Sequence, residues 1–255
     1  MSATQPDGIT TIAALLFLLL SGLLLSWFVL RLRKGDRYTF RRIAGFEALK
    51  GLLGTVAESG KRVHVSLGNS GIGGDQTASI SAGLAVLRFL ADQGAALGSL
   101  PIVTVADPSL LLVAQDVLYR AHRKAGNLVV RGQSSDVQLI APDAAAYAVG
   151  AQDQIDDERV MANVMVGHFG DEYLLLGEAG AQRHIVQVAG SNALGAHPFM
   201  IATSDQVLVG EEVFAAGAYL TDRPEYAASL RLQDVLRVLI AIAVLVGVLV
   251  KTLLG

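Results

Sequence analysis

Apolar positions dominate two segments of this chain, one near each end. Residues 9–30 carry no charged side chain over 22 positions, and a helix of that length would extend roughly 33 Å. Residues 238–254 are also apolar and are interrupted only by Lys251. Because a hydrocarbon core of about 30 Å requires such lengths, the pattern predicts a transmembrane helix in each segment. We assign residues 1–34 to an N-terminal anchor with a basic flank and residues 229–255 to a C-terminal transmembrane helix.

Each apolar segment has an alternative interpretation. No Lys or Arg precedes the first segment, and its apolar run is longer than the roughly 7–15 residues of a signal peptide, so we expect a retained anchor. The second segment has an uninterrupted run of only 13 residues, 238–250. That run would also suit a buried C-terminal helix. If the helix spans a bilayer instead, Lys251 can reach the headgroups.

Between the two segments, helical and strand patterns alternate. In residues 41–59 apolar side chains recur every three or four positions, which predicts a helix, whereas residues 62–67 (RVHVSL) alternate as in a strand. Asp107 followed by Pro108 is a typical helix start. Further helices are expected at residues 76–93, 107–124 and 206–220 and after residue 143, and further strands at residues 102–106, 137–141, 160–169 and 199–203.

This alternation predicts the fold class. Strands separated by helices of about 10–20 residues indicate βαβ units and a parallel sheet. Short apolar runs such as IVTVA in residues 102–106 suit strands buried on both faces. We therefore expect residues 35–228 to form a cytosolic α/β domain, a three-layer sandwich with a mostly parallel sheet. An antiparallel portion is expected within residues 160–204.

The charge pattern predicts the orientation of the domain relative to the membrane. The first apolar segment is followed by a basic cluster that contains a single acid, Asp36. The basic residues are Arg31, Arg33, Lys34, Arg37, Arg41 and Arg42. Arg231 and Arg237 likewise precede the second apolar segment. Because basic flanks remain in the cytoplasm, we expect a two-pass protein of the bacterial inner membrane, with its domain in the cytoplasm and both termini outside.

Composition excludes several classes of site. The formal net charge is −3 and the chain has no cysteine. The charge gives no indication of a nucleic-acid partner, and the missing cysteines exclude disulfides, thiolate metal sites and cysteine nucleophiles. The histidines show no HxxxH or HExxH spacing, so we expect no metal site, and no cofactor is indicated. The charged run in residues 153–159 is expected to be a solvated helix end or loop, with an acidic metal or partner site as the alternative.

A glycine-rich loop follows the first predicted strand and precedes a helix. Ligands bind at the carboxyl ends of parallel strands, and free N–H groups at a helix start favour an anion. The loop lacks the GxGxxG, GK[ST] and GxSxG motifs, and Asp75 would repel a phosphate. The loop is either a tight turn with close backbone packing or a loop that contacts a ligand or a partner. The candidate ligand-binding residues are Gly68, Asn69, Ser70, Gly71, Gly73, Gly74 and Asp75.

Ser109 allows one further interpretation. The order of strand, glycine loop, Ala-rich helix, strand and serine resembles the Clp-type and signal-peptide-peptidase serine proteases, in which a glycine loop forms the oxyanion hole. The resemblance would make Gly73 and Gly74 the oxyanion hole and Ser109 the nucleophile. His122 on the following helix would then be the base that such a serine needs. The preceding Asp-Pro pair departs from the small residues favoured there, and Ser109 equally suits a plain helix start.

A broader resemblance covers nearly the whole chain. Residues 211–220 read EEVFAAGAYL and residues 230–250 read LRLQDVLRVLIAIAVLVGVLV. Together with the N-terminal anchor and the GNSGIGGDQT loop, these segments resemble a family of uncharacterised bacterial membrane proteins with a domain of unknown function. The resemblance implies no activity and therefore no catalytic residues.

These features favour a membrane-tethered, self-assembling scaffold or interaction protein without catalytic activity. No complete catalytic motif is present, both ends are anchored, and Ala/Gly-rich helices can pack closely against copies of themselves. We expect the lipid bilayer as one partner and a second protein in the membrane as a possible further partner. We also expect a homo-oligomer in which apolar side chains of residues 41–59 face neighbouring copies. The alternative is a domain that binds a nucleotide or another small anion, or a hydrolase, using residues 68–75.

Overall fold

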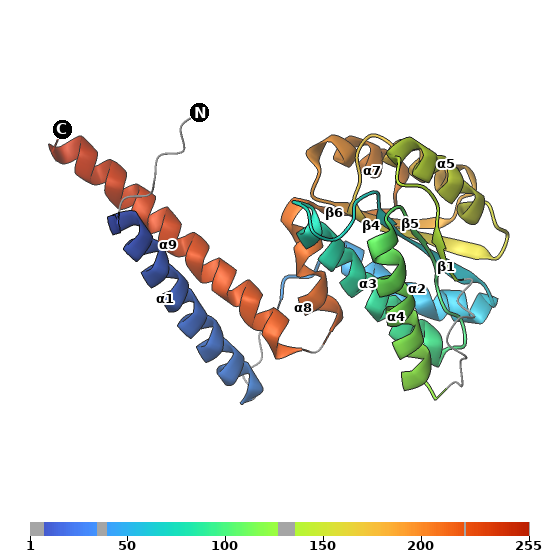
Figure 1. The fold of residues 1–255 in the computed structure, drawn as a ribbon, viewed down its shortest axis with the longest axis horizontal. Coiled ribbons are helices and arrows are strands. Elements are labelled where there is room, and N and C mark those ends of the chain that lie inside the picture. Colours follow the sequence, from blue (N-terminus) through green and yellow to red (C-terminus); the bar gives the residue numbers. More distant parts are fainter. Residues whose placement is uncertain (1–7, 35–39, 127–135, 222, 255) are drawn as a thin grey trace. The chain divides into compact units, whose positions relative to one another are not determined.

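The computed structural model describes residues 8–34, 40–126, 136–221 and 223–254 (Figure 1). They form two compact units. One unit contains helices α1 (Gly8–Arg33) and α9 (Pro224–Leu254), and the other contains all elements between residues 41 and 221.

Helices α1 and α9 lie against each other within their own unit. Their apolar windows, Ala14–Arg33 and Pro224–Leu253, have mean hydropathies of 2.2 and 2.4. Side chains such as Leu18 and Leu245 are exposed, at 67% and 64%. By length and composition, both helices can therefore cross a membrane, as the sequence predicts.

The second unit is built on one six-stranded sheet in which all strand pairs are parallel. The spatial order is β3-β2-β1-β4-β5-β6. The strands are β1 (Arg62–Gly68), β2 (Ile102–Val105), β3 (Val137–Leu139), β4 (Val160–His168), β5 (Val186–Ser191) and β6 (Gln206–Val209). The predicted α/β class and mostly parallel sheet are confirmed. The expected antiparallel portion in residues 160–204 is wrong, because β4 and β5 pair in parallel.

Helices cover both faces of this sheet (Figure 1). Contacts divide them into a group of α2, α3, α4 and α8 and a group of α5, α6 and α7. The helices are α2 (Ala44–Ser59), α3 (Thr77–Ala96), α4 (Pro108–Lys124), α5 (Ala144–Ile155), α6 (Tyr173–Gln182), α7 (His197–Thr203) and α8 (Ala216–Leu220). Two short 3-10 turns, η1 (Leu194–Ala196) and η2 (Gly210–Ala215), follow β5 and β6. The result is the three-layer arrangement expected from the alternating pattern.

Helix α2 buries its apolar face in the core of this unit. Phe46 and Leu49 are fully buried and Val56 is 1% exposed. The Phe46 ring stacks on Tyr219, with ring centroids 4.8 Å apart. The expectation that apolar side chains of residues 41–59 face neighbouring copies is therefore wrong, because these side chains already fill the core of their own chain.

The predictions for residues 199–209 are also wrong. Residues 199–203 belong to helix α7 rather than to a strand, and the predicted helix 206–220 contains β6, η2 and α8. An apolar run as short as FMIAT suits either a strand or a helix by its pattern. Tertiary context decides, because Pro198 lies in the first turn of α7 and the buried His197 Nε2 hydrogen-bonds Ser191 O at 2.7 Å.

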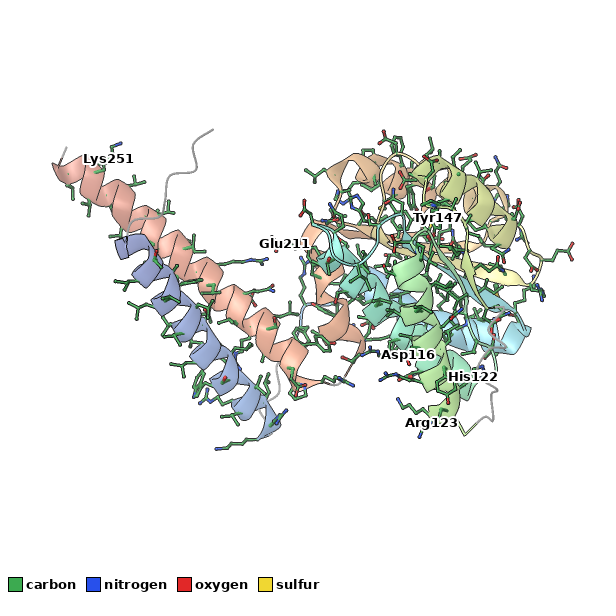
Figure 2. All side chains as sticks on the ribbon, in the orientation of Figure 1. Asp116, His122, Arg123, Tyr147, Glu211 and Lys251 are labelled. Carbon is green, nitrogen blue, oxygen red and sulfur yellow. The ribbon has the colours of Figure 1, made fainter. Side chains whose placement is uncertain are left out.

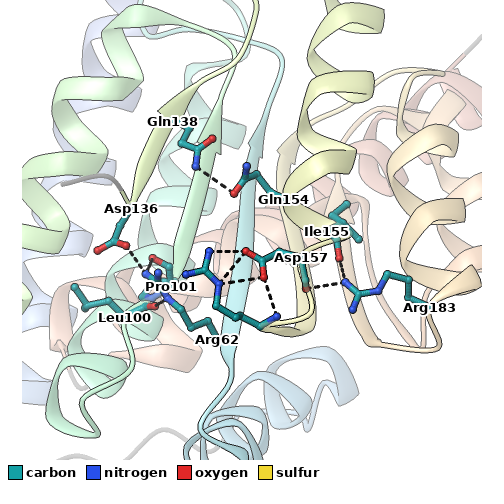
Figure 3. Close-up of polar contacts among 10 residues, drawn as sticks. Arg62, Leu100, Pro101, Asp136, Gln138, Gln154, Ile155, Asp157 and Arg183 are labelled. Carbon is teal, nitrogen blue, oxygen red and sulfur yellow. Dashed lines mark hydrogen bonds and ion pairs between the residues drawn. The ribbon is translucent and has the colours of Figure 1, made fainter.

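The amino edge of the sheet is closed by its own charged side chains (Figure 3). Arg62 donates from Nε to Leu100 O at 2.8 Å and from Nη2 to Asp136 Oδ1 at 2.6 Å. Arg183 donates to the carbonyl oxygens of Ile155 and Asp157. The charged run in residues 153–159 is thus a helix end and loop tied to the fold.

A row of buried polar side chains crosses the centre of the sheet. His64 on β1 lies 2.8 Å from Asn163 Oδ1 and 3.0 Å from Thr104 Oγ1. Asn163 in turn donates to Gln187 Oε1 at 3.1 Å. The Tyr147 hydroxyl group contacts Thr104 at 3.0 Å. Buried parallel strands are usually almost wholly apolar, so this row is a polar network inside the core.

The network holds His64 in its neutral form. Because Asn163 uses its amide N–H toward Gln187, its oxygen accepts from His64 Nδ1, and His64 Nε2 then accepts from the Thr104 hydroxyl group. Burial lowers the pKa of His64 from 6.5 to about 4. Burial also raises the pKa of Tyr147 to about 12. Neither side chain is charged at neutral pH.

This burial predicts a loss of stability in acid. The folded pKa of His64 lies below its unfolded value of 6.5, so the unfolded chain binds the extra proton between about pH 6.5 and 4. The free energy of unfolding should therefore fall by about 3 kcal/mol from this group as the pH drops from 7 to 4. Urea unfolding of the full chain in detergent, followed by near-UV circular dichroism, measures this change.

Two variants isolate the contribution of His64. His64→Gln should show a smaller loss between pH 7 and 4, whereas His184→Asn, at an exposed position, should keep the wild-type loss. Equal slopes in all three proteins would contradict the assignment.

Candidate functional site

The glycine loop lies where the strand order of the sheet reverses. From β1 the chain passes through α3 to β2, and from β4 it passes through α6 to β5 on the other side. The adjacent carboxyl ends of β1 and β4 therefore send their connections in opposite directions. Ligands of open α/β sheets bind outside the carboxyl ends of the strands at this switch point. The topology thus brings the predicted loop to the favoured binding position.

Three glycines permit a close approach of backbones at this point. A Cβ atom at Gly68, whose φ is +85°, would lie 2.1 Å from His168 O. A Cβ at Gly167 would lie 2.1 Å from Leu67 O, and one at Gly83 of α3 would lie 2.3 Å from Val166 O. No side chain fits at such distances. β1, β4 and α3 therefore meet only because these positions are glycine.

The glycine loop is organised by bonds to its own helix and to the next loop. Gly73 N–H donates to Thr77 Oγ1 at 3.2 Å, and this hydroxyl donates to Gly74 O at 2.6 Å. Ile72 N–H donates to Ser109 Oγ at 3.1 Å. In the described part of the chain, the N–H groups of Gly74, Asp75 and Gln76 have no hydrogen-bond partner. These donors at the start of α3 can bind an acceptor on a ligand.

Glu172 joins the loops that follow β1 and β4. Its Oε1 accepts from Asn69 Nδ2 at 2.7 Å and from Gly170 N–H at 2.8 Å. These two donors hold the carboxylate at the switch point. Asn69, a predicted ligand-binding residue, therefore orients a carboxylate that the sequence did not single out.

Unpartnered buried atoms gather at the same edge of the sheet. Among the described residues, five buried side-chain atoms have no hydrogen-bond partner. Four of the five belong to residues at the ends of β4 and β5 or at the start of α3. They are Gln76 Oε1, Ser79 Oγ, His168 Nδ1 and Asn192 Oδ1. Buried polar atoms are otherwise nearly always paired, so these four atoms are available to hydrogen-bond water or a ligand.

The residues of the serine-protease interpretation are not brought together. Ser109 lies in the first turn of α4, where its Oγ hydrogen-bonds Asp107 and accepts from Ile72. His122 lies thirteen residues further along the same helix, which corresponds to about 20 Å. Figure 2 shows His122 beside Arg123 at the far end of α4. Ser109 therefore connects two loops, and His122 is too far away to serve as its base.

No group of three or more His, Asp and Glu side chains in the described residues could hold a metal ion. Among the described residues, the carboxylates in the loops after β1 and β4 also form no ion pair with Lys or Arg. The site therefore consists of backbone N–H groups, amides, hydroxyls, imidazole and carboxylates. Such groups can bind and orient a small polar molecule.

The sequence pattern indicates the glycine loop but not several other residues of this site. Glu172, Ser79 and Asn192 carry no recognisable motif. One signal was available, since Asn69 and Asn192 each directly follow a buried strand. Polar residues at that place meet at one edge of a parallel sheet, but their neighbours depend on the strand order.

The glycines differ in a way that stability measurements can detect. Gly68→Ala should lower the free energy of unfolding by more than about 2 kcal/mol, because the new Cβ would overlap His168 O at a positive φ. Gly74→Ala should change it by less than about 0.5 kcal/mol, since no atom lies within 4 Å of its Cβ position and its φ is unstrained. Urea unfolding of the full chain in detergent compares them, and equal effects would contradict the geometry.

The comparisons with known proteins agree with the two-anchor architecture. Neither the curated proteins nor the solved structures yielded a match. A family model described as a domain of unknown function (DUF6754) matches residues 6–255. The match includes both apolar helices and the α/β unit between them. The chain therefore belongs to the DUF6754 family, a domain family of unknown function.

Proposed function

We propose that this protein is a membrane-anchored α/β domain that binds a small polar ligand at the switch point between β1 and β4. The observation that carries the proposal is the gathering of four unpartnered buried polar atoms at this edge. Each such atom costs about 1–3 kcal/mol if nothing pairs with it. A ligand that engages the edge, directly or through ordered water, would remove part of that cost.

The contrast with the amino edge supports this choice. There, Arg62 and Arg183 satisfy carbonyl and carboxylate oxygens across neighbouring segments. At the carboxyl edge, the N–H groups of Gly74, Asp75 and Gln76 have no such partners among the described residues, and neither do His168 Nδ1 and Asn192 Oδ1. Four of the five unpartnered buried side-chain atoms of the described residues thus lie at the carboxyl end of the sheet.

Ligand binding is better supported than the scaffold favoured by sequence patterns. The apolar side chains of α2 that would have faced neighbouring copies are buried in the core. A hydrolase using Ser109 is also less well supported, since the hydroxyl group of this serine is already hydrogen-bonded to Asp107 and to the N–H group of Ile72. The proposal therefore assigns binding, and no reaction, to the switch point.

A panel of small molecules tests this proposal. The full chain in nanodiscs should unfold at higher urea concentration with at least one amino acid, amine, sugar, nucleoside or nucleotide. A ligand at about 100 times its Kd adds about 2.7 kcal/mol to the free energy of unfolding. Gly74→Ala should reduce this gain, because its methyl group would lie beside the free N–H groups of the loop.

Gly54→Ala is the matched control. Gly54 is an exposed position of α2 with no atom within 4 Å of its Cβ position, so this variant should bind like the wild type. The proposal is wrong if no compound stabilises the wild type, or if both variants respond like the wild type.

We further propose that the α/β domain lies in the cytoplasm and that the protein crosses the bacterial inner membrane twice. The support is the basic cluster that begins at Arg31 and ends at Arg42, together with Arg231 and Arg237 beside the second span. Moving basic residues across the membrane is disfavoured. The same rule leaves both chain ends outside.

Cysteine labelling in intact cells tests the orientation, and the natural chain contributes no thiol. Thr4→Cys should react with an impermeant maleimide, whereas Thr55→Cys, at an exposed position of α2, should react only after the cells are permeabilised. The opposite pattern would reverse the assigned topology.

A further inference from the structure

We infer that the ligand of the switch point is a small organic cation, with an ammonium group that binds the carboxylate of Glu172. This inference rests on the proposed function and specifies the ligand class. It departs from the nucleotide or anion that a glycine loop at a helix start would suggest.

The first argument is the charge of the loops at this edge. Residues 68–76, 106–109, 168–172 and 191–197 contain no Lys or Arg. They do contain four carboxylates, Asp75, Asp107, Asp171 and Glu172. A phosphate would meet these charges with no cationic side chain in the same loops to offset them. An ammonium group would be attracted.

The second argument is the way Glu172 is held. Its Oε1 accepts from Asn69 Nδ2 and Gly170 N–H, at 2.7 and 2.8 Å. Its Oε2 has no hydrogen-bond partner among the described residues. Although Glu172 precedes α6, its side chain makes no capping hydrogen bond to that helix. The carboxylate is therefore oriented with one oxygen available for a charge-assisted hydrogen bond.

Helix capping explains why a carboxylate is present at Asp107, but it does not explain the carboxylate of Glu172. The Asp107 carboxylate accepts from Ser109 N–H at 2.7 Å and so caps α4. Carboxylates at helix starts are commonly present for this reason alone. Glu172 instead bridges the loops of two different strands, which is a geometry suited to a bound group between them.

A fully buried, unpartnered hydroxyl provides an independent observation. Ser79 is 0% exposed, and its Oγ has no partner among the described residues. It lies one helical turn before Gly83, whose Cβ position is 2.3 Å from Val166 O of β4. Because α3 starts at the carboxyl edge and Cβ atoms tilt toward the helix start, Ser79 is directed toward the end of β4 and the switch point.

Exposed apolar side chains lie in the same group of loops as the carboxylates. Ile72 in the glycine loop is 45% exposed, and Leu194 after β5 is 79% exposed. A Cβ at Gly195, next to Leu194, would lie 3.7 Å from Asp171 Oδ1. These side chains could cover a short hydrocarbon segment. We therefore assign the site to an aliphatic amine.

Putrescine and succinate form a matched pair of probes, since both have four carbons and they carry opposite charges. Equilibrium dialysis against the full chain in phosphatidylcholine nanodiscs should show saturable putrescine binding, with one molecule per chain, and no succinate binding. Glu172→Gln should weaken putrescine binding at least tenfold, because the charge-assisted bond is lost. Asp171→Asn provides a second variant if Glu172→Gln does not fold.

Glu158→Gln is the control for diffuse attraction, because it removes the same charge from an exposed position outside these loops. It should bind putrescine like the wild type. Equal weakening in Glu158→Gln and Glu172→Gln, or binding of succinate instead of putrescine, would overturn the inference. If neither probe binds while a neutral compound stabilises the wild type and not Gly74→Ala, the cationic class is wrong and the proposed function stands. If no compound of the panel binds either, both are wrong.

Discussion

The close approach of backbones at the ends of β1 and β4 is the constraint on which the rest of the α/β unit depends. Gly68 and Gly167 let these two strands meet where any Cβ would overlap a carbonyl group, and Gly83 lets α3 lie directly on β4. Because β1 and β4 form the centre of the sheet, the spacing there determines how the helices pack on either side. It also determines that the two loops meet closely enough for Asn69 to bind Glu172.

The two edges of the sheet differ in how their polar groups are satisfied. At the amino edge, Arg62 and Arg183 bond neighbouring segments. At the carboxyl edge, His168 and Asn192 contribute buried atoms without partners, and the nearby loops are acidic. This contrast supports the proposed placement of a ligand at the carboxyl edge, where the loops are carried by a rigid sheet.

The buried polar row crosses the centre of the sheet, between these two edges. His64, Asn163 and Gln187 bond in sequence across three neighbouring strands, and the Tyr147 hydroxyl contacts both Ser66 and Thr104 below the switch point. A satisfied network of this kind specifies one arrangement of strands, because a shift in register would leave buried groups unpaired. Figure 2 shows Tyr147 within the α/β unit. The network therefore keeps the strand ends, and hence the loops, in a defined position.

Local patterns in the sequence determined the two apolar spans, the α/β class, the strands from β1 to β4 and the glycine loop, because hydropathy length and period-two alternation act within one segment. They did not determine the secondary structure of residues 199–209. There, a short apolar run forms a helix after Pro198, and the edge strand β6 has only four residues. The pairing of Asn69 with Glu172, 103 positions apart, the neutral His64 and the unpartnered Ser79 were decided only by the tertiary structure. Hydrogen bonds and burial depend on which strands become neighbours, and the order β3-β2-β1-β4-β5-β6 arises from packing among distant segments that no local pattern encodes.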